Sequence, residues 1–209
     1  MGRKRNTYDV LKRWEAADML RLYTYQHIDA LNVLKSEGAI IIRDEQVKFN
    51  ESDMNYSFIN QSMAEHTTGY MGGNPLWFWA HPTPTQRLDR CMAAGKSVVC
   101  FECLIPRERV LLSDFNTWSI VIQNGIIQPL DISEEETYLA YDTYTDTQRQ
   151  ETWEHIFDLR FWSPTPPVEE GVRLTVQACV EVLFSTDIIS HRIITPKGRT
   201  VSKTVTTTA

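Results

Sequence analysis

Apolar and polar positions alternate with two different periods along the first half of the chain. Apolar side chains recur at helical spacing in residues 8–20 and again in residues 28–37, where Gly38 is suited to end the helix. Strands are predicted at residues 21–26, 39–42 and 76–80. Residues 43–73 are polar and show little periodicity, which predicts a long irregular segment of the kind that often carries function.

The second half of the chain continues this mixture of helices and strands. Helices are predicted at residues 85–94 and 113–123. Two further helices are predicted to begin at the capping boxes of residues 133–136 and 147–150. Strands are predicted at residues 98–105, 110–112, 173–184 and 188–194, with a proline-rich loop before the longest of them. This irregular order favours an α+β fold with a small split, mainly antiparallel sheet surrounded by helices.

The length of 209 residues fits one domain with an extension at each end. We expect a helical extension over residues 1–20, a core domain over residues 21–196 and a flexible tail over residues 197–209. Hydrophobic residues make up 42% of the chain, which is enough for a packed core. No apolar run approaches the roughly 18 residues of a membrane helix, and none follows the basic start as in a secretory signal. We therefore expect a cytoplasmic protein without membrane contact.

Charge is unevenly distributed along the chain, although the formal net charge is −6. Residues 131–170 hold eleven Asp and Glu against two Arg, whereas residues 1–13 hold five Lys and Arg against one Asp. The net charge excludes a wholly basic nucleic-acid binder but is compatible with a local basic patch. The simpler interpretation is that both segments are solvated surfaces.

The cysteines are Cys91, Cys100, Cys103 and Cys179. Cys100 and Cys103 form a CxxC within a predicted strand, where residues three apart face opposite sides and the two sulfurs therefore diverge. The sequence has no second CxxC or HxxxH to complete a zinc site. We therefore expect buried free thiols in a reducing compartment and no metal.

The familiar motifs GxGxxG, GxxxxGK[ST], GxSxG and HExxH are absent, and three segments remain as candidates for chemistry. The first contains Thr24 and Gln26, which share a face at the end of a predicted strand and are followed by a helix. Polar groups in this position suit a ligand bound at the strand end. The alternative is a polar strand edge beside an ordinary helix.

The second segment is the strongly aromatic strand at residues 75–81. Trp77 and Trp79 share one face, and Phe78 lies on the opposite face. One face can pack in the core while the other offers a stacking platform for a base or a nicotinamide ring. The alternative is that these aromatic side chains only pack in the core.

The third segment is the long strand predicted at residues 173–184, in which Gln177, Cys179 and Glu181 share one face opposite a row of apolar residues. A carboxylate in the middle of such a strand needs a partner or a function, because Glu is rarely buried without one. The alternative is an edge strand whose polar face is wet.

With these segments in view, the chain resembles two groups of proteins. Residues 21–192 resemble a bacterial domain family to which no function has been assigned. The segments that carry this resemblance are Thr24–Gln26, Pro75–Trp79, Val110–Trp118, Trp153–Asp158 and Val176–Ala178. Together they are fairly specific as a family signature, but they name no reaction.

The more distant resemblance is to the DarT-type ADP-ribosyltransferase toxins. Residues 25–38 resemble their opening strand and helix, and residues 75–79 with 82–84 are similar to their aromatic second strand and the turn after it. Glu181 falls where that superfamily keeps its catalytic glutamate. The chain departs from these toxins at Thr24-Tyr-Gln26, where they often have His-x-Thr.

This second resemblance implies an NAD-dependent ADP-ribosyltransferase with an ADP-ribosyltransferase-like sheet, of the kind found in toxin–antitoxin and phage-defence operons. Glu181 would be the catalytic carboxylate, because a negative charge near the ribose stabilises an oxocarbenium-like transition state. The residues implied to bind NAD, the co-substrate, are Thr24, Gln26, Trp77, Phe78, Arg87 and Gln177. An antitoxin protein is the implied partner.

The preferred acceptor is RNA or another single-stranded nucleic acid, because Trp and Tyr are plentiful and the N-terminus is basic. Two other hypotheses stay open: a non-catalytic module that binds nucleic acid or a partner on the same fold, and a hydrolase or nuclease of unrecognised type. The transferase hypothesis requires Thr24, Gln26, Trp77 and Glu181 to line one cleft.

Overall fold

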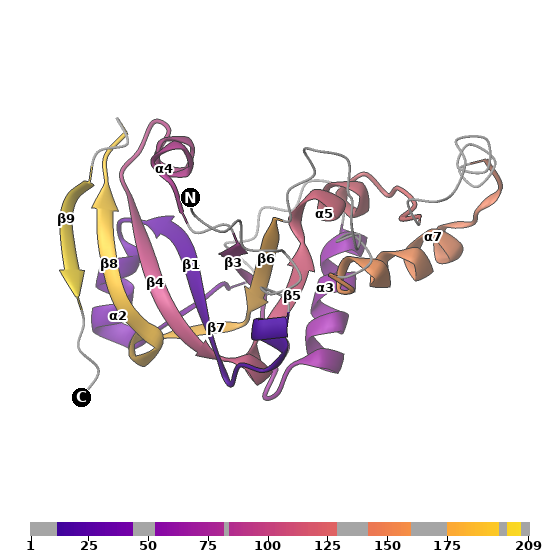
Figure 1. Cartoon of the computed structure of the whole chain (residues 1–209), viewed down its shortest axis with the longest axis horizontal. Coiled ribbons are helices and arrows are strands. Elements are labelled where there is room, and N and C mark those ends of the chain that lie inside the picture. Colours follow the sequence, from indigo (N-terminus) through magenta and orange to yellow (C-terminus); the bar gives the residue numbers. More distant parts are fainter. Residues whose placement is uncertain are drawn as a thin grey trace, which may run out of the picture.

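The computed structural model describes residues 12–43, 53–81, 84–128, 142–159, 175–196 and 200–205. Seven strands form one sheet in the order β5-β6-β3-β1-β4-β8-β9, and adjacent strands are antiparallel (Figure 1). These strands are β1 (Met19–His27), β3 (Leu76–His81), β4 (Val98–Pro106), β5 (Leu111–Asp114), β6 (Val176–Val180), β8 (Ile188–Ile194) and β9 (Thr200–Val205). A separate antiparallel pair consists of β2 (Ala39–Ile41) and β7 (Val182–Phe184).

Helices pack on both faces of the sheet. They are α2 (Ala30–Glu37), α3 (Asp53–His66), α4 (Gln86–Met92), α5 (Phe115–Ile122) and α7 (Asp146–Trp153). Three short 3₁₀ turns are η2 (Arg107–Arg109), η3 (Glu154–Ile156) and η4 (Ser185–Asp187). In the part of the chain that the structure describes, no helix is both long and apolar enough to cross a bilayer. The predicted α+β class with a mainly antiparallel sheet is confirmed.

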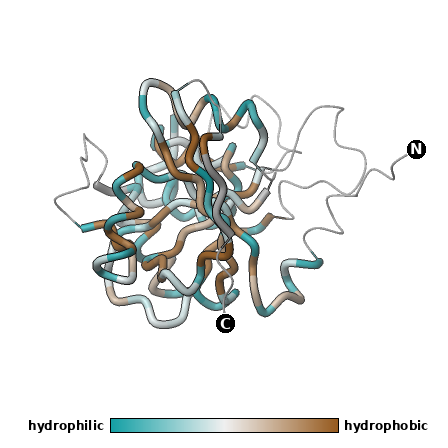
Figure 2. Tube along the Cα trace, turned by 90° about the vertical axis from the view of Figure 1, so that its left-hand side faces the viewer, coloured by the Kyte–Doolittle hydropathy of each residue, from teal (hydrophilic) through white to brown (hydrophobic). Residues whose placement is uncertain are grey.

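The two faces of the sheet belong to different apolar clusters, because successive strand residues point to opposite faces. Phe78 and Ala178 lie in the cluster that packs against Leu31 of α2. Trp77 and Cys179, their neighbours in β3 and β6, lie in the cluster formed with α3, α5 and η3. Figure 2 shows the corresponding hydrophobic colour along the strands in the middle of the molecule.

Local signals in the sequence placed several helix ends correctly. Gly38 ends α2 with a left-handed backbone (φ 75°), and its N–H donates to the carbonyl of Leu34 at 3.0 Å. Thr85 caps α4, since its hydroxyl accepts the N–H of Leu88 at 3.3 Å. Both contacts lie within a few residues of the signal, so the sequence alone determines them.

The irregular segment predicted at residues 43–73 contains the helix α3, so this prediction was wrong for residues 53–66. Ile59 and Met63 lie one turn apart and are fully buried. Asn55 and Ser62 are buried as well, and each donates a side-chain hydrogen bond to a backbone carbonyl. Because polar residues occupy part of the buried face, the helical period is weak in the sequence.

The single strand predicted at residues 173–184 is two strands. β6 ends at Val180, Glu181 forms a bend, and β7 leaves the large sheet to pair with β2. Gln177 and Glu181 therefore do not share a face of one continuous strand. The alternative of a wet edge strand is also wrong, because β6 lies between β5 and β3 and all of its residues are buried.

The chain ends differ from the predictions as well. The predicted helix at residues 8–20 is helical at the described residues 12–15, and β1 already begins at Met19. The predicted loose tail contains β9, which pairs with β8 along Thr200–Val205. A polar strand of this kind is visible only once its partner is known, because its own sequence has few apolar residues.

Two further corrections are local. The capping box that opens α7 is formed by Thr145 and Gln148, two residues before the predicted position. Cys91 is exposed, whereas the other three cysteines are buried free thiols as predicted. The capping box predicted at residues 133–136 and the proline-rich loop lie outside the described residues.

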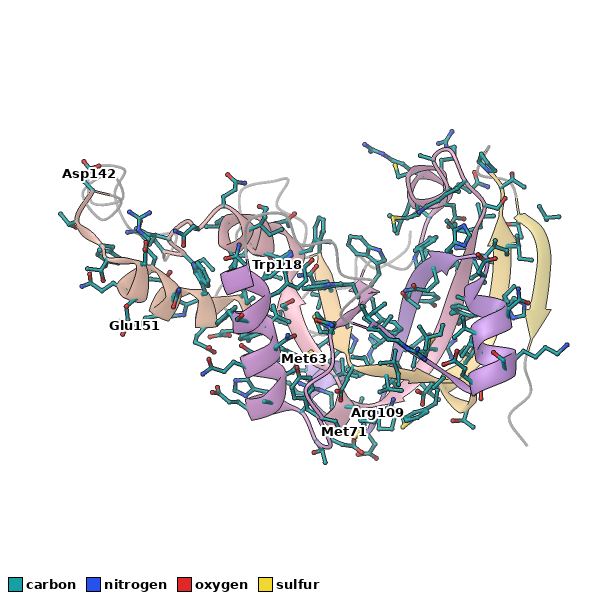
Figure 3. All side chains as sticks on the ribbon, turned by 180° about the vertical axis from the view of Figure 1, so that it is seen from behind. Met63, Met71, Arg109, Trp118, Asp142 and Glu151 are labelled. Atoms are coloured by element: carbon teal, nitrogen blue, oxygen red, sulfur yellow. The ribbon has the colours of Figure 1, made fainter. Side chains whose placement is uncertain are left out.

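An ion pair with little solvent exposure fixes the turn between β7 and β8. Arg109 donates to both carboxylate oxygens of Asp187, at 3.0 and 3.1 Å, and to the carbonyl of Val182 at 2.7 Å. Asp187 also accepts the N–H of Phe184 at 3.0 Å, and the guanidinium lies 4.8 Å from the ring centre of Phe184. Figure 3 labels Arg109 at the lower edge of the molecule.

We expect Arg109→Met to lower the free energy of unfolding by about 3 kcal/mol, because it leaves the carboxylate of Asp187 buried without its partner. Urea denaturation of the purified protein measures this difference. The matched control is Arg43→Met, since the pair of Arg43 with Glu37 at 3.1 Å has both side chains more than half exposed. This control should change stability by less than about 1 kcal/mol. Equal effects of the two substitutions would contradict the structural role of Arg109.

Candidate functional site

The candidate site lies where β1 and β3 diverge. Every residue of β1 has a partner in β4, from Met19 to His27. β1 pairs with β3 in register at Tyr23 and Trp79, whereas β3 pairs with β6 from Leu76 to His81. The large sheet therefore consists of two halves that join at one point and splay apart beside it.

Thr24 connects the two halves where the strands separate. Its side chain is buried, and its hydroxyl donates to the carbonyl of Trp77 at 2.8 Å. The hydroxyl in turn accepts a hydrogen bond from Nε2 of Gln26, also at 2.8 Å. A side-chain hydroxyl thus bonds a strand carbonyl at the edge of the gap and holds the amide of Gln26 beside it.

A cavity of about 500 Å³ occupies this region and is lined by residues of β1, β3, β6, α3, α4 and α5. Seven aromatic side chains line it: Tyr25, Tyr56, Trp77, Phe78, Trp79, Phe115 and Trp118. The ring centres of Trp77 and Trp118 lie 5.2 Å apart, and those of Trp79 and Phe115 lie 4.8 Å apart. Among the described residues no charged side chain lines the cavity, so its aromatic walls suit a flat ring.

Gln26 and Gln177 supply the amide groups of this cavity. Gln177 is 5% exposed, and its Nε2 has no hydrogen-bond partner among the described residues. The hydroxyl of Ser113, which pairs in register with Gln177 across β5 and β6, has none there either. A buried donor without a partner costs about 1–3 kcal/mol, so a ligand carbonyl that bonds to Gln177 would bind favourably.

α4 forms one wall of the cavity through Met92 and is anchored to two strands. Asp89 accepts the hydroxyl of Tyr25 at 2.5 Å and pairs with Arg192, whose Nη2 lies 2.7 Å from Oδ1. Burial, followed by the hydrogen bond to Asp89, raises the pKa of Tyr25. Burial also raises the pKa of Cys100 to about 11. Both groups are therefore neutral at pH 7.

Glu181 lies in the bend between β6 and β7 and is 9% exposed. Its carboxylate accepts the backbone N–H of Gly73 at 2.6 Å and the N–H of Met71 at 3.0 Å. Burial and the nearby charge of Glu181 raise the pKa of Tyr70, whose hydroxyl donates to the carbonyl of Gly73 at 2.8 Å. Two backbone donors thus hold the carboxylate of Glu181 against the loop that precedes β3.

Glu181 sits close to one end of the cavity. Val180 pairs in register with Leu76, and both Leu76 and Pro75 line the cavity. The loop that binds the carboxylate of Glu181 leads directly into this start of β3. The carboxylate is thus neither solvated nor on the wall of the cavity.

The structure brings together part of the predicted NAD site. Gln26, Trp77, Phe78 and Gln177 line the cavity. Thr24 is buried and bonded to Gln26, whereas Arg87 is exposed on α4. Neither Thr24, Arg87 nor Glu181 is a lining residue. The transferase hypothesis requires four residues to line one cleft. Gln26 and Trp77 do so, whereas Thr24 and Glu181 do not, and the requirement is therefore met only in part.

Sequence reasoning missed the aromatic residues that complete the cavity. Phe115 and Trp118 come from α5, where their spacing of one helical turn is visible in the sequence. Tyr56 comes from α3, which the sequence did not reveal. No periodic pattern relates these residues to β3, because the contacts depend on how the helices pack on the sheet.

A second cavity, of about 370 Å³, lies at the other side of β5. Glu15, His66, Arg107 and Asp158 give it mixed charge, and none of the predicted site residues lines it. Within the described ranges, no group of three or more His, Cys, Asp or Glu side chains is arranged to hold a metal ion.

Comparisons with known proteins give one result. The family model of a domain of unknown function, DUF3841, matches residues 21–178, and the chain therefore belongs to this family. The match covers most of β1, all of β3 and every described residue that lines the aromatic cavity. No curated protein and no solved structure matches the chain significantly.

We expect Gly73→Ala to destabilise the protein, because a Cβ at residue 73 would lie 2.8 Å from Oε1 of Glu181. The cost should be about 1–3 kcal/mol, since the side chain or the loop must move. In the Glu181→Ala background the same substitution should cost less than about 0.5 kcal/mol, because the clashing atoms are gone. Thermal unfolding of the four proteins of this double-mutant cycle gives the coupling. If the effects of the two substitutions on stability are additive, the loop at Gly73 does not contact the carboxylate of Glu181.

Thr24→Val should destabilise the protein by about 1–2 kcal/mol, because it removes the hydroxyl between Gln26 and the carbonyl of Trp77. Thr24→Ser keeps the hydroxyl and should cost less. Urea denaturation measures both differences. If serine is as costly as valine, the methyl group and not the hydroxyl joins the two halves of the sheet.

Proposed function

We propose that this member of the DUF3841 family is an NAD-dependent ADP-ribosyltransferase that modifies a nucleic acid, with RNA as the preferred acceptor, and acts as a toxin. One observation carries the proposal. The three segments that resemble the DarT-type toxins lie on or directly after β1, β3 and β6, and these strands are neighbours in the sheet. The cavity that these strands share supports the proposal, because its aromatic walls and two amide side chains suit a nicotinamide ring.

The reaction breaks the bond between the nicotinamide nitrogen and C1′ of the ribose, and the bonding electrons leave with nicotinamide. A nucleophile of the acceptor forms a new bond to C1′ and loses a proton. Positive charge develops on the ribose, so a carboxylate close to it lowers the barrier. Glu181 suits this role because two backbone N–H groups hold its carboxylate in place.

The cavity supports binding of the leaving group. Its aromatic walls can stack on the nicotinamide ring, which is flat and polarised. The unpaired Nε2 of Gln177 can donate to the carboxamide oxygen, and Gln26 lies across the same cavity. Arg87 is exposed on α4 and carries the positive charge that the diphosphate of NAD would need.

One observation favours the rival hypothesis of a non-catalytic binding module. The carboxylate of Glu181 is bonded to the loop at Met71 and Gly73, and Glu181 does not line the cavity. Transfer therefore requires the ribose to reach this end of the cavity, whereas a binding module requires only the aromatic walls.

Incubation with NAD labelled in the adenylate moiety tests the proposal. We expect label in the RNA pool after its separation from DNA and protein. Glu181→Gln keeps the size of the side chain but loses its charge, and it should reduce the rate by about 10²-fold or more. Gln177→Leu should weaken NAD binding, measured by calorimetry, by about fivefold or more.

The outcomes separate the hypotheses. Labelled RNA that depends on Glu181 supports the transferase. NAD binding that depends on Gln177, with no label in any pool and no difference between wild type and Glu181→Gln, would favour the binding module. Cleavage of RNA without NAD would favour a nuclease.

A further inference from the structure

We propose that a single-stranded nucleic acid lies across the mouth of the cavity, with a base on the exposed ring of Phe115 and its phosphates along α4. The inference deepens the proposed transferase function, on which it rests, because this strand would be the acceptor. Two surfaces carry it, an apolar one on α5 and a basic one on α4, and both helices contribute residues to the cavity lining.

The apolar surface is the exposed face of α5. Phe115 is 40% exposed and Ile122 is 50% exposed, and both line the cavity. They lie seven residues apart, which is two helical turns, so they share one face of the helix. The ring of Phe115 packs against Trp79 at 4.8 Å and is thereby held in place. A fixed, exposed ring beside a cavity suits a stacked base, since stacking requires a flat partner and no particular sequence.

The basic surface is α4 together with the turn after it. Arg87, Arg90 and Lys96 are all exposed. None of them forms an ion pair with another residue in the described ranges. Asp89, the acidic residue of α4, is buried and already paired with Arg192. Arg90 and Lys96 are therefore available for phosphates, on and just after the helix whose Met92 lines the cavity.

The surrounding charge makes this surface specific. The whole chain carries a net charge of −6, which repels nucleic acid, so attraction must come from a local cluster. An acidic peptide would also be attracted to α4, but it brings no flat rings to Phe115. The combination of phosphate-binding cations and an exposed aromatic ring therefore favours a single strand with unpaired bases.

Fluorescence anisotropy with a labelled 12-nucleotide RNA tests this surface in the absence of NAD. The double variant Arg90→Gln/Lys96→Gln should bind about fivefold or more weakly, and its slope of log K against log salt should fall by about 1.4. Lys96→Gln alone should lower the slope by about 0.7. The matched control is Lys35→Gln, which removes an exposed lysine from α2 on the other face of the sheet and should change neither value.

Phe115→Ser tests the stacked base. It should weaken binding about tenfold without changing the salt slope, because it removes an aromatic ring and no charge. DNA of the same sequence and the matching duplex complete the comparison. Binding of either single strand in preference to the duplex supports the proposal. Equal or tighter binding of the duplex, or of an acidic peptide of equal charge, would overturn it.

The outcome of the RNA-binding assay is independent of the outcome of the NAD-labelling assay. If the substitutions in α4 and at Phe115 weaken RNA binding but no NAD is consumed, this surface is supported and the transferase proposal is overturned. Labelling of protein instead of nucleic acid, without strand binding, overturns this surface and leaves a transferase with another acceptor. No binding of any strand at low salt overturns the surface.

Discussion

The candidate site depends on how β1 divides its hydrogen bonds between two neighbours. β1 pairs with β4 along its whole length, and β3 pairs with β6, so the two halves of the sheet are in register at Tyr23 and Trp79. Strands twist, and two halves that each follow their own partner diverge away from such a point. The divergence opens space for the aromatic side chains, and the hydroxyl of Thr24 bonds a strand carbonyl beside the gap.

The elements around this gap are held by buried polar contacts as well as apolar ones. Asp89 ties α4 to Tyr25 of β1 and to Arg192 of β8. Arg109 ties the turn after β7 to η2 in the same manner. Such contacts contribute little compared with apolar packing, but breaking one of them leaves a buried charge and is costly. They fix the relative positions of elements that are distant in sequence, and hence the shape of the cavity.

The sequence predicts those parts of the structure that depend on local chemistry. Gly38 and Thr85 end or begin helices through contacts within four residues, and the aromatic strand β3 is evident from its composition. The end of β6 at Val180 was not predictable, because the apolar alternation continues into β7 while the partner strand changes. α3 was not predicted, because the polar residue Asn55 occupies part of its buried face. For the site, the sequence identified Gln177 but not the helices that face it.

The bend after β6 also explains why a carboxylate is tolerated there. On a central strand, Glu181 would face an apolar cluster without donors, and burial of its carboxylate there would be costly. At the bend, the backbone N–H groups of Met71 and Gly73 are free of any strand partner and point at the carboxylate. Gly73 allows this approach because a side chain at this residue would collide with Oε1. The position of this carboxylate beside an uncharged aromatic cavity is therefore a consequence of where the chain leaves the sheet.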